Sequence, residues 1–175
     1  MYVSRLAAMA AALSFAAVAL AQGKGPSDPQ IAGIVVAANQ IDIDAGKLAK
    51  SRSKNKAVQD FAQLMITDHT AVNQQAGALV KKLGVKPEDS DTSRSLKSAA
   101  KETEGKLKAL KGAAFDKAYA DNEVAYHQQV LDAIDKVLIP NAQNAELKAL
   151  LEKVRPAIAA HLDHAKMMAS SLGKK

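Results

Sequence analysis

The stretch FAQLMITDHTAVNQQAGALVKKLG, residues 61–84, carries the pattern that decides the fold. Its apolar side chains recur at spacings of three and four, the repeat of one face of an α-helix; they are Phe61, Leu64, Met65, Val72, Leu79 and Leu83. Gly84 ends the pattern, as glycine commonly does just past a helix. The same face carries Asp68 and His69, so the question of function is whether such polar groups bind a ligand or only join helices.

Three other segments show the same repeat, and no segment alternates with the period of two that a β-strand requires. The sequence therefore predicts four long amphipathic helices, over residues 29–52, 55–83, 113–138 and 145–172. Asp28 is the expected N-cap of the first helix, with Pro29 at its first helical position. Pro140 and Asn141 are expected to end the third helix, and Pro156 is expected to kink the fourth.

Residues 84–112 join the two helical pairs and are mostly polar and rich in lysine. They include a weaker helical segment over 94–111, for which Asp91, Thr92 and Ser93 are the cap candidates. A connection of this length can cross the bundle, so the third helix would begin at the same end as the second. The predicted fold is all-α: a ferritin-like four-helix bundle with one long crossover that contains a short extra helix.

The first 21 residues are typical of a signal peptide, because Arg5 precedes an apolar run over residues 6–20 that ends among small residues. The run is shorter than the roughly 20 residues that cross a bilayer, so we expect no transmembrane segment in the mature chain. Residues 22–28 would then be a flexible leader and residues 29–173 the bundle domain. The expected location is the periplasm, as a soluble protein.

The composition excludes several classes of protein. The 175 residues include no cysteine, which excludes disulfides and thiolate metal sites. The net charge of +6 is dispersed and aromatic residues make up 3%, which argues against nucleic-acid binding. One basic run leaves open either a weak contact with anionic envelope components or a solvated helix end; it comprises Lys50, Arg52, Lys54 and Lys56. The sequence has no glycine-rich phosphate loop and no nucleophile elbow.

Each predicted long helix carries one polar residue on or beside its apolar face at a similar height in the bundle. At about 1.5 Å per residue, Asp42, His69, His127 and His161 lie within roughly one turn of each other. Once buried, they must be hydrogen-bonded or bind a metal ion. Metal candidates of second rank are Glu123, Asp68 and His164, and candidates for hydrogen bonds to the ligands are Asp44, Tyr119 and Tyr126.

The donor set limits the metal. A dinuclear iron site in such a bundle takes Glu-x-x-His from two helices, but Ile66, Val124 and Ile158 stand three residues before the three histidines. A mononuclear site of imidazoles and one carboxylate suits zinc, copper, nickel or iron. Met167 and Met168 are interpreted as core filling rather than as copper ligands.

Three segments in family order carry a resemblance: IDIDAGKLAKSRSKNKAVQDFAQLMITDHTAVN, FDKAYADNEVAYHQQVLDAID and RPAIAAHLDHA. The chain resembles, over about residues 30–172, a bacterial family of exported, ferritin-like proteins known as a domain of unknown function and sometimes named "predicted outer membrane protein". The family's signature positions fall on Asp68, His69, Asp116, Tyr119, His127, Pro156 and His161. Asp42 departs from the glutamate common in the family, and His164 is not part of its pattern. The resemblance implies the fold and export but no activity.

From these observations we expect an exported helical bundle protein that binds a transition-metal ion, such as zinc, copper or iron, in its core. Its role would be metal handling or protection against envelope stress, without catalytic residues. Two other interpretations stay open. The protein could be a non-enzymatic structural or interaction protein with a buried histidine hydrogen-bond network, or a metal-dependent redox enzyme acting on oxygen or peroxide.

Overall fold

The computed structural model describes residues 25–173. Every regular element in that range is helical, which confirms the all-α bundle; the elements are α2 (Asp28–Arg52), α3 (Lys56–Leu83), α4 (Asp91–Ala109), α5 (Gly112–Ala133), η1 (Ile134–Leu138), α6 (Ile139–Asn141) and α7 (Ala145–Leu172). The predicted signal peptide and the first residues of the predicted leader lie outside the described residues.

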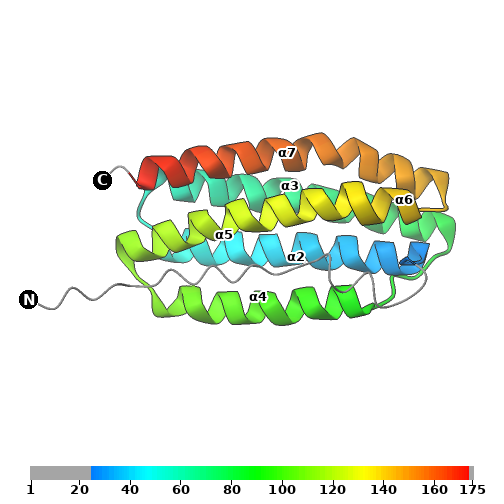
Figure 1. Ribbon diagram of the computed structural model, residues 1–175, viewed down its shortest axis with the longest axis horizontal. Helices are drawn as coiled ribbons and strands as arrows, with labels where there is room; N and C mark the ends of the chain where they lie inside the picture. The colour runs from blue at the N-terminus through cyan, green and yellow to red at the C-terminus, as the bar shows by residue number, and fades with distance from the viewer. Residues whose placement is uncertain (1–24, 174–175) are drawn as a thin grey trace, which may run out of the picture.

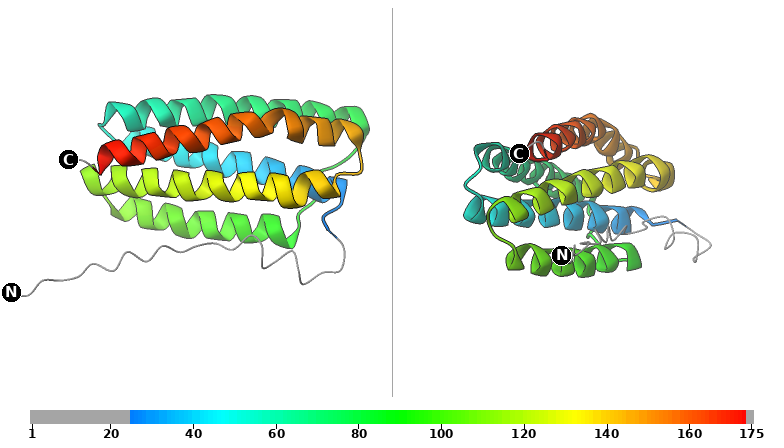
Figure 2. Two further views of the ribbon diagram at one scale, coloured as in Figure 1. Left: turned by 45° about the horizontal axis from the view of Figure 1, so that its top comes forward. Right: turned by 60° about the vertical axis from the view of Figure 1, so that its left-hand side comes forward.

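Two helical hairpins form the bundle (Figure 1). In one hairpin α2 packs along α3, in the other α5 packs along α7, and contacts between α3 and α7 help to join the two. Figure 2 shows that α4 runs back along the outside of the bundle, where it packs mainly against α2. As a result α5 begins at the end of the bundle where α3 begins, as the predicted crossover requires.

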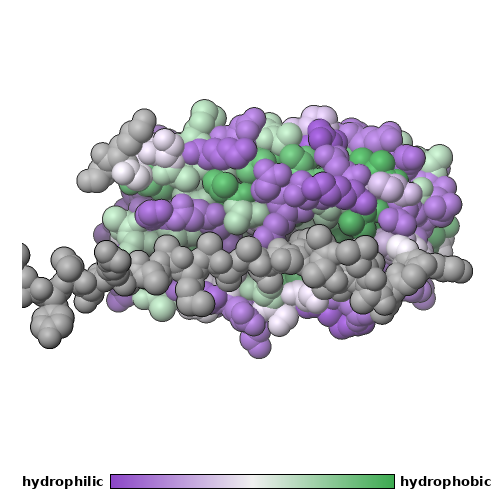
Figure 3. All heavy atoms as spheres, viewed as in Figure 1, coloured by the Kyte–Doolittle hydropathy of each residue, from purple (hydrophilic) through white to green (hydrophobic). Residues whose placement is uncertain are grey.

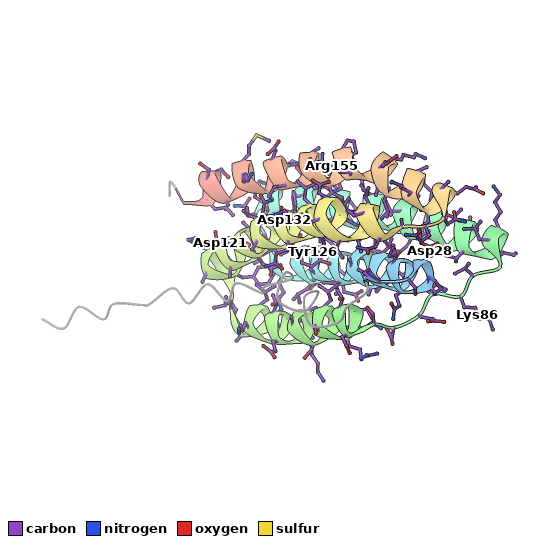
Figure 4. All side chains as sticks on the ribbon, turned by 45° about the vertical axis from the view of Figure 1, so that its right-hand side comes forward. Asp28, Lys86, Asp121, Tyr126, Asp132 and Arg155 are labelled. Carbon is purple, nitrogen blue, oxygen red and sulfur yellow. The ribbon has the colours of Figure 1, made fainter. Side chains whose placement is uncertain are left out.

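The start of α2 differs from the prediction in its capping. Ser27, not Asp28, is the N-cap residue, and Asp28 is the first residue inside the helix. The Asp28 carboxylate accepts hydrogen bonds from the backbone N–H groups of Gln143 and Asn144, each at 2.9 Å. Because this carboxylate is used by a distant loop, it is not free to cap its own helix. Asp28 thereby fastens the start of α2 to the loop before α7 (Figure 4).

The crossover is more regular than predicted, because α4 is a helix of 19 residues. Its N-cap is Ser90 rather than any of the three predicted residues: Ser90 Oγ accepts from Ser93 N–H at 3.1 Å, and Ser93 Oγ accepts from Ser90 N–H at 2.9 Å. The loop before α4 lies on α2 at Gly33, where Glu88 N–H donates to Pro29 C=O at 2.9 Å. These bonds hold the crossover against α2.

The helical run that begins with α5 ends at Asn141, one of the two residues predicted to end it, but its last turns are irregular. α5 passes into the π-helical segment η1, and helical structure continues as α6 through Pro140. Pro140 is the second residue of α6, directly after the π-helical segment. Arg155 of α7 binds Asp135 of η1 through Nε–Oδ1 at 2.5 Å and Nη2–Oδ2 at 2.7 Å. α7 continues through Pro156 as one helix (Figure 1).

Two apolar clusters fill the bundle, one toward each end. Members of the cluster near the start of α2 include Ile31, Ile34, Leu138, Leu151 and Ile158. Members of the cluster near the end of α2 include Phe61, Met65, Phe115, Tyr119 and Met168. Along the four long helices, a group of buried polar residues lies between these two clusters: Asp42, His69, Glu123, His127 and His161. The bundle therefore has a polar layer at mid-height.

The outer surface is mixed in polarity. On the face shown in Figure 3, hydrophilic side chains are spread over the helices with smaller apolar areas between them. Within residues 25–173, no helix is both long enough and apolar enough to traverse a bilayer.

Candidate metal centre

Four polar side chains meet in the polar layer, one from each long helix. Asp42 lies on α2, His69 on α3, His127 on α5 and His161 on α7, and none is more than 4% exposed. The centroids of the three imidazole rings are 5.3 to 5.8 Å apart. One ligand atom from each histidine lies within 4.8 Å of those of the other two. The structure thus brings together the four residues that the sequence predicted to be neighbours.

Asp42 stands close to two of the histidines. Its Oδ2 atom lies 2.7 Å from His69 Nε2 and 3.2 Å from His127 Nε2. Two ligand atoms on one tetrahedral zinc ion, with bonds of about 2.0–2.1 Å, are roughly 3.3 Å apart. The separation of 3.2 Å between Asp42 and His127 is close to the one that a single metal ion imposes, and that of 2.7 Å between Asp42 and His69 is somewhat shorter.

The outward nitrogens of His69 and His127 both lie on carbonyl oxygens. His69 Nδ1 is 2.6 Å from Asn39 Oδ1, and the Asn39 amide is oriented by its own donation to Val35 C=O at 2.8 Å. His127 Nδ1 is 2.9 Å from the backbone carbonyl oxygen of Glu123. Because a carbonyl oxygen has no proton, each Nδ1 must carry the hydrogen and donate it. In the neutral ring, Nε2 then holds a lone pair.

His161 is held through its opposite nitrogen. His161 Nε2 lies 2.9 Å from Asp68 Oδ2, so Nε2–H donates to the carboxylate and Nδ1 holds the lone pair. The Asp68 side chain is 39% exposed. Among the residues that accept from the three histidines, Asp68 is the one whose side chain meets solvent. An outer acceptor of this kind fixes the tautomer and orientation of an imidazole that binds a metal.

The inward-facing atoms have no hydrogen-bond partner among the described residues; they are His69 Nε2, His127 Nε2, His161 Nδ1 and both carboxylate oxygens of Asp42. With both rings neutral, the Asp42 carboxylate and the two Nε2 lone pairs would face each other as acceptors, so the contacts at 2.7 and 3.2 Å require a second proton on one ring or a cation between them. An unsatisfied buried polar group costs about 1–3 kcal/mol. A cation among the three histidine nitrogens, or between Asp42 and its two neighbouring histidines, would give these atoms a partner.

Glu123 lies beside this group, fully buried and one turn before His127. Ligand atoms of Asp42, Glu123 and His127 lie within 4.8 Å of one another. Burial, followed by the charge of Asp42, raises the pKa of Glu123 well above its ordinary value, which favours its neutral form. Burial also opposes the ionisation of Asp42, but the attraction of His69 and the contact with His127 outweigh it and lower the pKa of Asp42. The centre therefore combines one carboxylate with one neutral carboxylic acid.

Two tyrosines border the centre. Tyr126 donates its hydroxyl hydrogen to Ala38 C=O at 2.8 Å, and its ring lies edge-on to the His127 ring with centroids 5.9 Å apart. In Figure 4 Tyr126 lies between α5 and α2. Tyr119 is fully buried one turn before Glu123, and its hydroxyl has no hydrogen-bond partner among the described residues. Burial raises the pKa of both tyrosines, so both stay neutral.

Two of the predicted site residues lie away from the centre. The Asp44 side chain is 60% exposed and lies 3.7 Å from Lys47 Nζ. It does not reach the ligands, because Asp44 lies two residues after Asp42 and therefore on the opposite side of α2. The His164 ring packs edge-on against Phe61 with centroids 5.1 Å apart, and the residue belongs to neither group of converging ligand atoms.

Asn39 is the functional candidate that sequence reasoning missed. It is buried on α2, about one turn before Asp42, and supplies the acceptor that orients His69. The sequence did offer a sign of this role, because Asn39 is a polar amide on the buried face of the helix, three residues before the predicted ligand Asp42.

Comparisons with known proteins give a family and a fold. The sequence profile described as "Domain of unknown function (DUF4142)" matches residues 11–168. The structure is similar to a solved structure described as "CopM in the Cu(II)-bound form", with a TM-score of 0.62 and 15% sequence identity over 83% of this chain and 98% of that chain. At this identity the likeness shows the fold alone. No curated protein matches the chain in sequence.

Proposed function

The chain belongs to the DUF4142 family, and from the polar layer of its bundle we propose that it binds one transition-metal ion through His69, His127, His161 and Asp42. One observation carries the proposal. Each histidine gives its proton to an outward acceptor and directs an unpaired nitrogen toward the same buried space as the Asp42 carboxylate. This is the arrangement that metal-binding imidazoles need.

The donor atoms favour a borderline metal ion. Three imidazoles and one carboxylate suit copper, zinc, nickel or iron, and the chain offers no thiolate that would direct the site toward softer ions. Copper is the first ion to test, because the protein of similar fold, CopM, is described in a Cu(II)-bound form. Zinc is the useful companion because it has no redox chemistry.

A purely structural hydrogen-bond network is less well supported. In such a network each buried acceptor faces a donor, whereas here the ring protons of the neutral histidines are all used on the outward side. A network would need at least one imidazole to carry a second proton. That second proton would have to lie on His69 or His127, whose Nε2 atoms face the Asp42 carboxylate in the core.

We further propose a role in metal sequestration or handling in the cell envelope rather than catalysis. Three histidines and Asp42 would supply four protein donors, the number in closed tetrahedral sites that hold an ion, while catalytic sites keep a position open. The predicted signal peptide supports the envelope location.

The test is elemental analysis of the mature chain, residues 22–175, purified without a tag or chelator and then incubated separately with copper, zinc and iron. We expect about one ion per chain for at least one metal. The variant with His69→Gln, His127→Gln and His161→Gln should bind none while its circular dichroism remains helical. His161→Gln alone serves if the triple variant does not fold, and it should bind markedly more weakly.

His164→Gln is the matched control, because His164 is a neighbouring histidine outside the converging group. It should retain the wild-type stoichiometry. Wild-type protein without metal under all three incubations, or a folded triple variant with full metal content, would exclude the proposed site.

A further inference from the structure

A cavity of about 40 Å³ adjoins the candidate metal centre on the side toward the start of α2. His69 and His127 form part of its wall, and the other wall residues come from α2, α3, α5, η1 and α7. One buried water needs only about 10–15 Å³ of such volume. The cavity therefore has room for a molecule of a few atoms beside two of the imidazoles.

The polar groups in the cavity wall are already hydrogen-bonded on the protein side. The Tyr126 hydroxyl donates to Ala38 C=O, and the Asn39 amide is bonded to Val35 C=O and to His69 Nδ1. Most of the remaining wall is aliphatic, and Val72, Val130 and Ile158 are among these side chains. The wall thus offers a molecule almost nothing but apolar contact.

A bound metal ion would engage the two histidines of the wall. His69 and His127 belong to the wall, and the Nε2 atom of each, a proposed metal ligand, has no hydrogen-bond partner among the described residues. A buried water typically makes about three hydrogen bonds. With the metal in place a water in the cavity would find no comparable partners, whereas an apolar molecule needs none.

We propose that the cavity binds a small apolar molecule of the size and chemistry of dioxygen, and holds it beside the metal ion. The inference rests on the proposed metal site, because it places the molecule beside the ion that His69 and His127 would coordinate. It assigns a ligand class to a space that the metal ligands themselves do not fill. The ion would then meet small apolar molecules on this side of the bundle and water only elsewhere.

Xenon is the probe for this site, because it is apolar, takes no part in hydrogen bonds and scatters strongly. Crystals of the zinc-loaded mature protein are pressurised with xenon, and the xenon and zinc occupancies are measured in the same crystals. We expect a xenon peak in contact with Val130 and Ile158. Val130→Ile and Val72→Ile each add one methylene to the wall, and each should lower the xenon occupancy at least several-fold.

Val124→Ile is the matched control, since it makes the same change on α5 but packs against the other apolar cluster. It should leave the xenon occupancy unchanged, and all three variants should keep one zinc per chain. Full zinc occupancy without a xenon peak, or with an ordered water in the cavity, overturns this inference and leaves the metal proposal standing. A wild-type protein that binds none of zinc, copper and iron overturns both proposals.

Discussion

Asn39 and Asp68 perform the same task with different chemistry. Each accepts the outward proton of an imidazole, Asn39 with a neutral amide oxygen and Asp68 with a carboxylate. Asn39 is buried, so its amide needs its own donor bond to Val35 C=O, whereas the Asp68 carboxylate is half-exposed and meets solvent. The two residues illustrate how burial selects the acceptor.

Replacing Asn39 with leucine preserves its approximate size but removes the acceptor of His69 Nδ1–H. We expect zinc affinity to fall by about 10–100-fold, the usual effect of losing such a partner. Asn39→Asp keeps an acceptor oxygen and should lose less. Competition titrations against a chromophoric chelator measure the affinities, and an unchanged affinity in Asn39→Leu would show that Asn39 does not orient a ligand.

The stability of the metal-free protein should depend on the protonation of His161. Burial lowers the pKa of this imidazole below its ordinary 6.5, although the hydrogen bond to Asp68 acts in the opposite direction. The unfolded chain therefore binds this proton more readily than the native protein does, and the free energy of unfolding rises with pH. We expect the neutral His161 ring to make its full contribution to the free energy of unfolding above about pH 6.5. That contribution should decline as the pH falls from there toward the lowered pKa of the native protein.

Urea unfolding in the presence of a chelator, at several pH values between 8 and 5, measures this dependence. His161→Gln should show a shallower slope over the same range. A metal-free protein that became more stable on acidification in this window would contradict the assignment of His161 as a buried neutral group.

The inward positions of the four central residues could be predicted, whereas the roles of the ring nitrogens could not. Helical spacing alone places Asp42, His69, His127 and His161 on buried faces at similar heights. Which nitrogen of each ring faces inward depends on acceptors from other residues, and one of these, the carbonyl oxygen of Glu123, is a backbone atom that every residue has. Sequence patterns do not contain this information.

Among the elements, α4 departs most from its sequence pattern. Its few apolar side chains predicted a weak helix, but the loop before it is fixed to α2 where Glu88 lies on Gly33. Tertiary contact thus outweighs a weak amphipathic pattern. The π-helical segment η1 was not foreseen either, because a single extra residue in a turn leaves no distinct signature in the sequence.

Gly33→Ala tests how closely the crossover approaches α2. A Cβ atom at this position would lie 2.0 Å from the backbone carbonyl oxygen of Glu88, so the loop would have to move. We expect a loss of about 1–3 kcal/mol in the free energy of unfolding, as for overpacking elsewhere. Thermal and urea unfolding measure it.

Gly77→Ala is the matched control, because a Cβ at Gly77 of α3 meets nothing within 4 Å. Glycine is unfavourable inside a helix, so this change should stabilise the protein by about 0.5–1 kcal/mol. Equal effects of the two substitutions would mean that the crossover does not press on α2 at Gly33.

At the scale of the whole molecule, the bundle joins helices from both hairpins through one polar layer. Asp42 and His69 belong to the first hairpin, His127 and His161 to the second. The overall architecture could be predicted because long amphipathic segments and one long connection leave few alternatives. A metal ion in the layer would connect the two hairpins directly.

Metal binding should therefore stabilise the entire fold. At a free zinc concentration of 100 times Kd, binding to the native state alone adds about 2.7 kcal/mol. For a domain of this size that corresponds to a rise in Tm of about 5–10 °C. Differential scanning calorimetry with zinc and with chelator measures the shift, and the triple histidine-to-glutamine variant should show none; a similar shift in that variant would indicate binding elsewhere.

The bond between Asp68 and His161 has a consequence for rates rather than for equilibrium. It is the point where a buried group of the centre touches a half-exposed one, and a carboxylate there attracts cations from a distance. Asp68→Asn keeps an oxygen that can accept the His161 proton but removes the charge. We expect slower metal uptake and a weaker dependence of the uptake rate on ionic strength, measured by stopped-flow mixing. Adding Gln63→Glu, elsewhere on α3, to the Asp68→Asn variant restores the net charge but should not restore the rate. How quickly the ion is captured would thus be set at the surface, and how long it stays would be set in the core.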